Sequence, residues 1–226
     1  MERTFWIFEV LLLIIMELRI YMKKLIALFA FCAAMAASLY ARDVTISIGA
    51  GEGWKGPQLA VWLEDQNGRY IKTLYVTKKA SALSWLFGPK EGRPESLPVW
   101  YHASKHDSKK SAAQDGSQKE IDAVTSATPK GGLVINQKIG DEPCVIKVEV
   151  NASFDYNSTW TKKNSGVNGQ PSLVYQTLVP AGQKEELSFE LIGSGSPDGS
   201  DGTVRKNAAG IDSAKTIVRI INVTFN

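Results

Sequence analysis

The stretch that decides the fold runs from Gln58 to Thr77 and reads QLAVWLEDQNGRYIKTLYVT. Leucine and valine recur at every second position from Leu59 to Leu63, which is typical of a β-strand with alternate residues on opposite faces. The opposite face carries Ala60, Trp62 and Glu64. Asn67-Gly68 is a hairpin-turn signal, and the β-branched and aromatic residues 70–77 follow it. The stretch therefore predicts a β-hairpin.

Further strand signals flank this hairpin on both sides. They lie at residues 44–48, 97–101, 145–153, 173–179, 187–192 and 216–225. Within 145–153, we expect Ile146, Val148 and Val150 to face inward. Lys147 and Glu149 are expected to face water. Many short alternating strands between Gly- and Pro-containing turns predict an all-β fold, an antiparallel Ig-like β-sandwich.

Two segments lack this alternation. Residues 102–119 are polar with almost nothing to bury, which predicts an exposed, mobile loop. Residues 193–212 are rich in Gly, Ser and Asp and predict a long excursion before the last strand. Because no internal repeat interrupts the pattern, we expect a single β-sandwich domain over residues 43–226.

The N-terminal region predicts export. Met22-Lys23-Lys24 and the apolar run 25–37 have the build of a signal peptide over residues 22–41, with cleavage after Ala41. Residues 1–21 then form an upstream extension. The alternative is an uncleaved membrane anchor through residues 5–41. After cleavage the protein would be periplasmic and not integral to the membrane, and Cys144 would have no partner for an internal disulfide.

Composition excludes several classes of function. The net charge is +3, from 26 basic and 23 acidic residues, which is too balanced for an electrostatic nucleic-acid binder. Two histidines and two cysteines leave little material for a metal centre. There is no Gly-x-Ser-x-Gly or His-Glu-x-x-His motif, so we expect no enzyme acting through its own side chains.

Several sequence blocks, in order, resemble the predicted periplasmic proteins of domain-of-unknown-function family 2271. They are residues 58–65, 97–100, 122–129, 148–151, 153–157 and 165–172. The hairpin 62–76 is also similar to the Ig-like unit of flagellar hook-capping proteins. The family resemblance implies an exported β-sandwich, often alongside PepSY-type membrane proteins and periplasmic flavin transferases.

The segment from Asp122 to Thr128 resembles the acceptor motif of proteins with covalently attached FMN. In that motif an Asp precedes a Ser or Thr, a small pair and a terminal hydroxyl residue, here Asp122, Thr125, Ser126 with Ala127, and Thr128. The resemblance implies a phosphoester between the flavin and Thr128. Ser126 departs from the motif, which usually has Gly there. The alternative is a structural turn, in which Asp122 or Thr125 bonds nearby backbone.

Each of two pairs of polar residues has both a functional and a structural interpretation. His102 and His106 are four residues apart and could ligate a metal or haem, or one could pack while the other is solvated. Asp198 and Asp201 lie in an oxygen-rich segment that is either a calcium loop or an ordinary Asp-Gly turn.

A cluster of aromatic and polar residues follows the strand 145–153. It consists of Phe154, Tyr156 and Trp160 with Asn151, Asp155 and Asn157. At one end of a sandwich, such residues can form a platform that binds a sugar or a flavin. Alternatively, they pack over the end of the hydrophobic core and close it.

The sequence as a whole predicts an exported accessory or binding protein of a membrane-associated flavin or electron-transfer system, with FMN as its candidate cofactor. Membrane redox proteins or a flavin transferase would be its partners. The alternative is a structural or adhesion-type Ig-like module without a redox role.

Overall fold

The computed structural model describes residues 18–19, 21–26, 41–78, 80, 93–112, 124–126, 131–206 and 209–226. The chain divides into two compact units, Met1–Arg42 and Asp43–Asn226. In the first unit, residues 21–26 are helical, and the rest of the predicted export leader lies almost wholly outside the described residues. None of the helices in the described part of the chain is long and apolar enough to cross a membrane.

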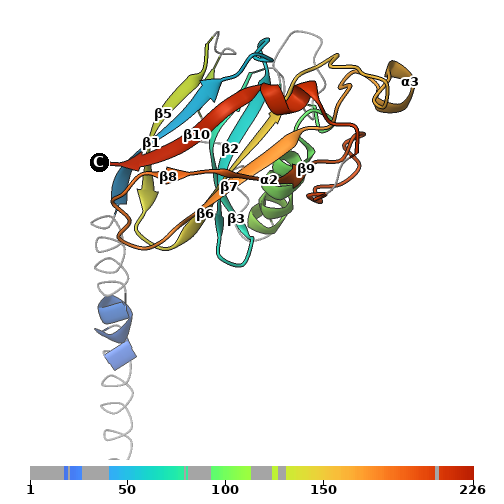
Figure 1. Cartoon of the computed structure of the whole chain (residues 1–226). Coiled ribbons are helices and arrows are strands. Elements are labelled where there is room, and N and C mark those ends of the chain that lie inside the picture. The colour runs from blue at the N-terminus through green and yellow to red at the C-terminus, as the bar shows by residue number, and fades with distance from the viewer. Residues whose placement is uncertain are drawn as a thin grey trace, which may run out of the picture. The chain divides into compact units, whose positions relative to one another are not determined.

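The second unit is built from two β-sheets packed face to face (Figure 1). The smaller sheet, called sheet A, has the order β5 (Leu133–Gly140), β1 (Ala41–Ala50), β10 (Val218–Phe225) and β8 (Leu187–Ser188). The larger, sheet B, has the order β4 (Val124–Ser126), β3 (Tyr70–Thr77), β2 (Gln58–Asp65), β6 (Cys144–Asn151), β7 (Leu173–Val179) and β9 (Glu190–Ser194). β3 and β4 pair in parallel, and the other described registers are antiparallel. The predicted all-β sandwich is confirmed.

The predicted hairpin is confirmed at its predicted bounds. β2 and β3 pair antiparallel, with Ala60 opposite Val76 and Glu64 opposite Tyr70. Gly68 has a φ of +75°, a backbone conformation that glycine adopts without steric cost. The Asp65 carboxylate accepts hydrogen bonds from the Asn67 and Arg69 amides and closes the turn.

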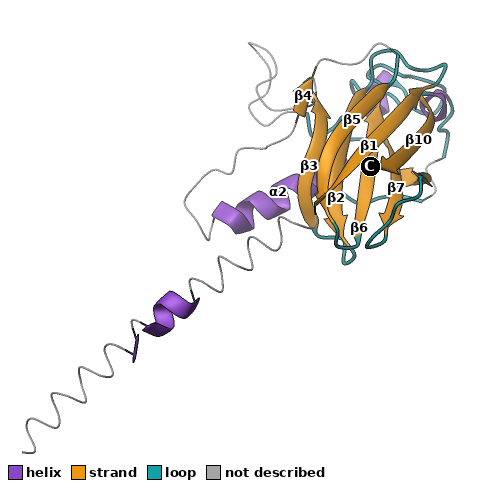
Figure 2. Cartoon of the chain, turned by 90° about the vertical axis from the view of Figure 1, so that its left-hand side faces the viewer, coloured by secondary structure: helices purple, strands orange, loops and turns teal. Residues whose placement is uncertain are grey.

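Sheet B is covered on both faces, and this explains why β2 is buried almost throughout. Leu59, Val61 and Leu63 enter the core between the two sheets. Ala60 and Trp62 face a second apolar cluster on the outer side, formed with helix α2 (Pro98–Ala112). Figure 2 shows α2 lying beside β2 and β3.

Helix α2 corrects two predictions, the strand at 97–101 and the polar loop from residue 102. Pro98 occupies the first helical position, where its missing N–H costs nothing and its fixed φ suits a helix. Leu97, Val99 and Trp100 are buried against sheet B, so packing overrides the β-propensity of this segment.

The prediction that Glu149 faces water is wrong, because α2 covers that face of β6. Glu149 is fully buried, whereas Lys147 is partly buried and forms an ion pair with Glu64 over 2.7 Å. Ile146, Val148 and Val150 are buried in the core between the sheets, as predicted. Cys144 is a buried free cysteine.

The predicted strand 187–192 is divided between the two sheets. β8 pairs with β10 in sheet A, and β9 pairs with β7 in sheet B. At the crossing, the Phe189 amide donates to the Ile221 carbonyl of β10 over 3.0 Å, so the chain leaves sheet A after Phe189. Two further strands, β4 and β5, are absent from the sequence prediction.

Candidate functional site

Three residues of the flavin-acceptor segment, Val124–Ser126, form the edge strand of sheet B. β4 pairs with β3 so that Thr125 lies opposite Val76 and Ser126 opposite Thr77. Both residues have strand backbone, so Ser126 does not adopt the left-handed conformation that favours glycine. Asp122, Ala127 and Thr128 lie outside the described residues.

The two histidines both lie on α2, which places them at helical spacing. The Nε2 atom of His102 lies 2.9 Å from the Gly199 carbonyl, and its ring makes an edge contact with Tyr101 at 5.4 Å between centroids. The side chain of His106 lies outside the described part. Within the described ranges, no cluster of three His, Cys, Asp or Glu residues is placed to hold a metal ion.

Asp198 and Asp201 serve local turns in the segment after β9. Asp198 accepts hydrogen bonds from the Ser196 hydroxyl at 2.5 Å and from the Ser200 amide at 3.0 Å, and these contacts lower its pKa. Asp201 binds the Arg205 guanidinium with both oxygens, at 3.1 and 2.7 Å. Hydrogen bonding to Arg205 lowers the pKa of Asp201 to about 2.

The predicted aromatic cluster does not form one surface. Phe154 is 66% exposed and makes an edge contact with Tyr156 at 6.4 Å between ring centroids. Trp160 is half-buried and donates through Nε1 to the Ala209 carbonyl at 3.1 Å. Asn151 points inward and donates to the Ser96 carbonyl. Trp160 and Asn151 thus make structural contacts, while Phe154 points into solvent.

A polar network joins the Asp155 loop to the segment before β10. The buried Gln170 amide donates to Asp155 at 3.0 Å and accepts from the Asp212 amide at 2.7 Å. The Ser213 hydroxyl donates to Asp155 at 2.7 Å. Asp155 and Gln170 therefore fix the position of residues 211–213.

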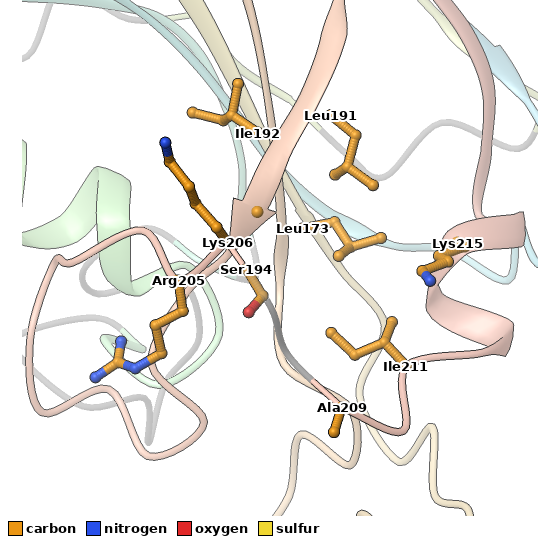
Figure 3. Close-up of a pocket in the computed structure, with 10 residues that line it drawn as sticks. Leu173, Leu191, Ile192, Ser194, Arg205, Lys206, Ala209, Ile211 and Lys215 are labelled. Carbon is orange, nitrogen blue, oxygen red and sulfur yellow. The ribbon is translucent and has the colours of Figure 1, made fainter.

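Beside that segment lies a cavity of about 420 Å³, which we call the β9 cleft (Figure 3). Its lining comes from β7, from β9 and from the excursion that precedes β10. It comprises Leu173, Leu191, Ile192, Gly193, Ser194, Arg205, Lys206, Ala209, Ile211 and Lys215. Cavities of this volume hold small-molecule ligands in other proteins.

The β9 cleft has an apolar side and a basic rim. Leu173 and Ile211 are buried in the core between the sheets, whereas Leu191 is 44% exposed. Lys206 and Lys215 are exposed. The sequence prediction missed this site because its residues come from separate segments, although the predicted excursion 193–212 contains several of them.

Fold and cleft together define a β-sandwich domain with a ligand-sized cavity at one edge. Residues 41–142 match the family described as "Predicted periplasmic protein (DUF2271)". The predicted resemblance and the periplasmic location are thereby confirmed; the blocks at 148–172 lie beyond the matched range. No curated protein and no solved structure gives a match.

Proposed function

We propose that this periplasmic protein is an accessory of a membrane-associated flavin or electron-transfer system and that it carries FMN on Thr128. The observation that carries the proposal is the place of β4. Its residues Val124–Ser126 form the edge of sheet B, and Ser126 is two residues before the acceptor position in the sequence. An edge strand has one side without a neighbouring strand, so a modifying enzyme can approach the chain there.

Two local features favour Thr128 as the acceptor. Pro129 disfavours helical backbone at the residue that precedes it, which is Thr128. Ser126, the departure from the usual Gly, lies in a strand, where a side chain carries no backbone penalty. The Thr128 hydroxyl would attack the flavin-side phosphorus of FAD; the diphosphate bond breaks, AMP leaves, and the hydroxyl proton passes to solvent. An attached flavin supplies redox chemistry that the side chains lack.

Intact-mass measurement of the exported chain, produced with and without a flavin transferase, tests the proposal. We expect one added FMN phosphoester and a flavin absorbance spectrum. Thr128→Ser retains a hydroxyl and should retain the flavin, whereas Thr128→Val, which has the same shape as threonine, should lose it. A colourless, unmodified wild-type protein would overturn the flavin proposal and favour the structural or adhesion-type module.

A further inference from the structure

The β9 cleft exists because one continuous chain segment changes sheets. The Phe189 amide is bonded to β10, and five residues later the Ser194 amide is bonded to the Arg205 carbonyl at 3.0 Å. After Phe189 the chain runs along sheet B as β9, and the segment that leads to β10 returns beside it, so β9 and this segment form the walls of the cleft. It leads directly to the core residues Leu173 and Ile211.

One side of the cleft combines an apolar surface with a cation. In Figure 3, Leu191, Leu173, Ile211 and Lys215 lie on one side of β9, and Ile192 and Lys206 lie on the other. Leu191 is 44% exposed although it borders the core, so a ligand lying against it would remove apolar surface from water. The apolar side therefore suits an aliphatic chain, with Lys215 at its end.

The positive charge of the cleft is not neutralised from within. Arg205 is paired with Asp201 at 2.7 Å. Lys206 and Lys215, by contrast, have no ion-pair partner among the residues that the structure describes. The cleft is consequently suited to a ligand with a negative charge, and Lys215 is the cation nearest to the apolar side in Figure 3.

A buried hydroxyl supports the same conclusion independently. The Ser194 side chain lines the cleft, and its Oγ atom is buried with no hydrogen-bond partner in the described part of the chain. Nearly all buried polar groups in proteins have a partner, so this hydroxyl is available to donate a hydrogen bond to a ligand in the cleft. A carboxylate oxygen would accept its hydrogen bond.

The walls of the cleft are held in place before any ligand arrives. Ser194 and Arg205 exchange two backbone hydrogen bonds, at 3.0 and 2.8 Å. On the other wall, Gln170 and Asp155 fix the segment that contains Ile211 and leads to Lys215. Rigid walls reduce the entropy lost when a ligand binds.

We propose that the β9 cleft binds a small amphiphilic anion, an aliphatic chain that ends in a carboxylate. The chain lies against Leu191, Leu173 and Ile211. The carboxylate meets Lys215 and accepts the hydrogen bond of Ser194. This proposal does not rest on the proposed flavin attachment at Thr128, because no residue of the cleft belongs to the acceptor segment.

Calorimetric titration of the exported protein with octanoate tests the proposal. Octanoate should bind, octanol should bind at least about fivefold more weakly because it lacks the charge, and acetate should not bind. Lys215→Gln should weaken octanoate binding about fivefold and leave octanol binding unchanged. Leu191→Ser should weaken both about tenfold.

Matched variants separate the cleft from general charge effects. Lys206→Gln, on the other side of β9, should have a smaller effect than Lys215→Gln, and Lys162→Gln on α3 (Lys162–Ser165) should have none. Thermal unfolding of each variant shows that it is folded. The proposal is overturned if octanoate does not bind, or if Lys215→Gln and Lys162→Gln have the same effect on octanoate binding.

Discussion

The Glu149 carboxylate caps a helix whose first turn lies 49 residues earlier in the chain, accepting a hydrogen bond from the Trp100 amide at 2.8 Å. It also accepts from the Val99 amide at 3.2 Å and from the Ser172 hydroxyl at 2.6 Å. First-turn amides have no partner within their helix, so β6 supplies one to α2. Burial raises the pKa of Glu149 to about 7, because the charged form loses its water, while the three hydrogen bonds oppose this effect.

Glu149 should make the protein less stable as the pH rises from about 4.5 to about 7. In this range the unfolded chain releases the Glu149 proton while the folded chain retains it, so unfolding is favoured progressively. Below and above this range both states carry the same charge. Glu149→Gln resembles the protonated carboxyl group and should remove the decline, which is on the order of 3 kcal/mol. Urea unfolding between pH 4 and pH 8 measures it.

The difference between wild type and Glu149→Gln isolates this residue, because the other titrating groups are common to both proteins. If wild type instead gained stability relative to the variant as the pH rose, the hydrogen bonds from Val99, Trp100 and Ser172 would outweigh the loss of water around the charge.

Lys147→Met should destabilise the protein by about 3 kcal/mol, because it leaves the buried Glu64 carboxylate without its cation. Glu64 Oε2 lies 2.7 Å from Lys147 Nζ, and Oε1 accepts from the Trp62 indole at 2.8 Å. Adding Glu64→Gln should recover most of the loss, since the amide oxygen still accepts from Trp62. The free energy of unfolding at pH 7 measures each variant.

The exposed ion pair between Arg69 and Asp65 is the control for the pair between Lys147 and Glu64. Arg69 Nε lies 2.6 Å from Asp65 Oδ2. Arg69→Met should cost no more than about 1 kcal/mol, because solvent screens exposed charges. Equal losses at Arg69 and Lys147 would show that burial of Glu64 does not determine the strength of its ion pair.

The strands that the sequence predicts from alternation are β1, β2 and β6, in which apolar residues recur at every second position. Helix α2 was not predicted because Val99, Trp100 and Tyr101 favour strands locally, while the contacts that make them helical come from sheet B and Glu149. Glu149 itself was misplaced for the same reason: a polar residue in an alternating strand faces water only if nothing covers that face. Contacts with residues that are far apart in the chain cannot be predicted from the local alternation of apolar and polar residues.

The two candidate sites also differ in how far the sequence alone predicts them. The acceptor segment from Asp122 to Thr128 is a contiguous motif, so sequence alone is enough to propose it. The β9 cleft unites Leu173, Ser194 and Lys215, which are far apart in the chain and carry no motif. Its position depends on the sheet crossing at Phe189, which alternation could not predict because both halves of that segment are strands.

Gly169→Ala should destabilise the protein by more than about 2 kcal/mol, which exceeds the cost of left-handed backbone alone. Gly169 has a φ of +77°, and an added Cβ would clash with the Asp155 carbonyl, which accepts the Gln170 amide at 2.9 Å. Gly182 is the matched control, because its φ is +66° and no atom lies within 4 Å of its Cβ position. Thermal unfolding should therefore show a larger loss of stability for Gly169→Ala than for Gly182→Ala. Equal losses would mean that the loop around Asp155 shifts to make room for the added Cβ.

Phe154→Asn should stabilise the protein by about 0.5–1 kcal/mol, because asparagine tolerates left-handed backbone better than phenylalanine does. Phe154 has a φ of +65°, is 66% exposed, and keeps its amide bonded to the Val167 carbonyl at 2.8 Å. Val167→Asn is the control: Val167 is also exposed but has ordinary backbone, so this variant should bring no gain. Urea unfolding measures both variants. A loss of stability in Phe154→Asn would instead mean that the ring contact with Tyr156 outweighs the backbone strain.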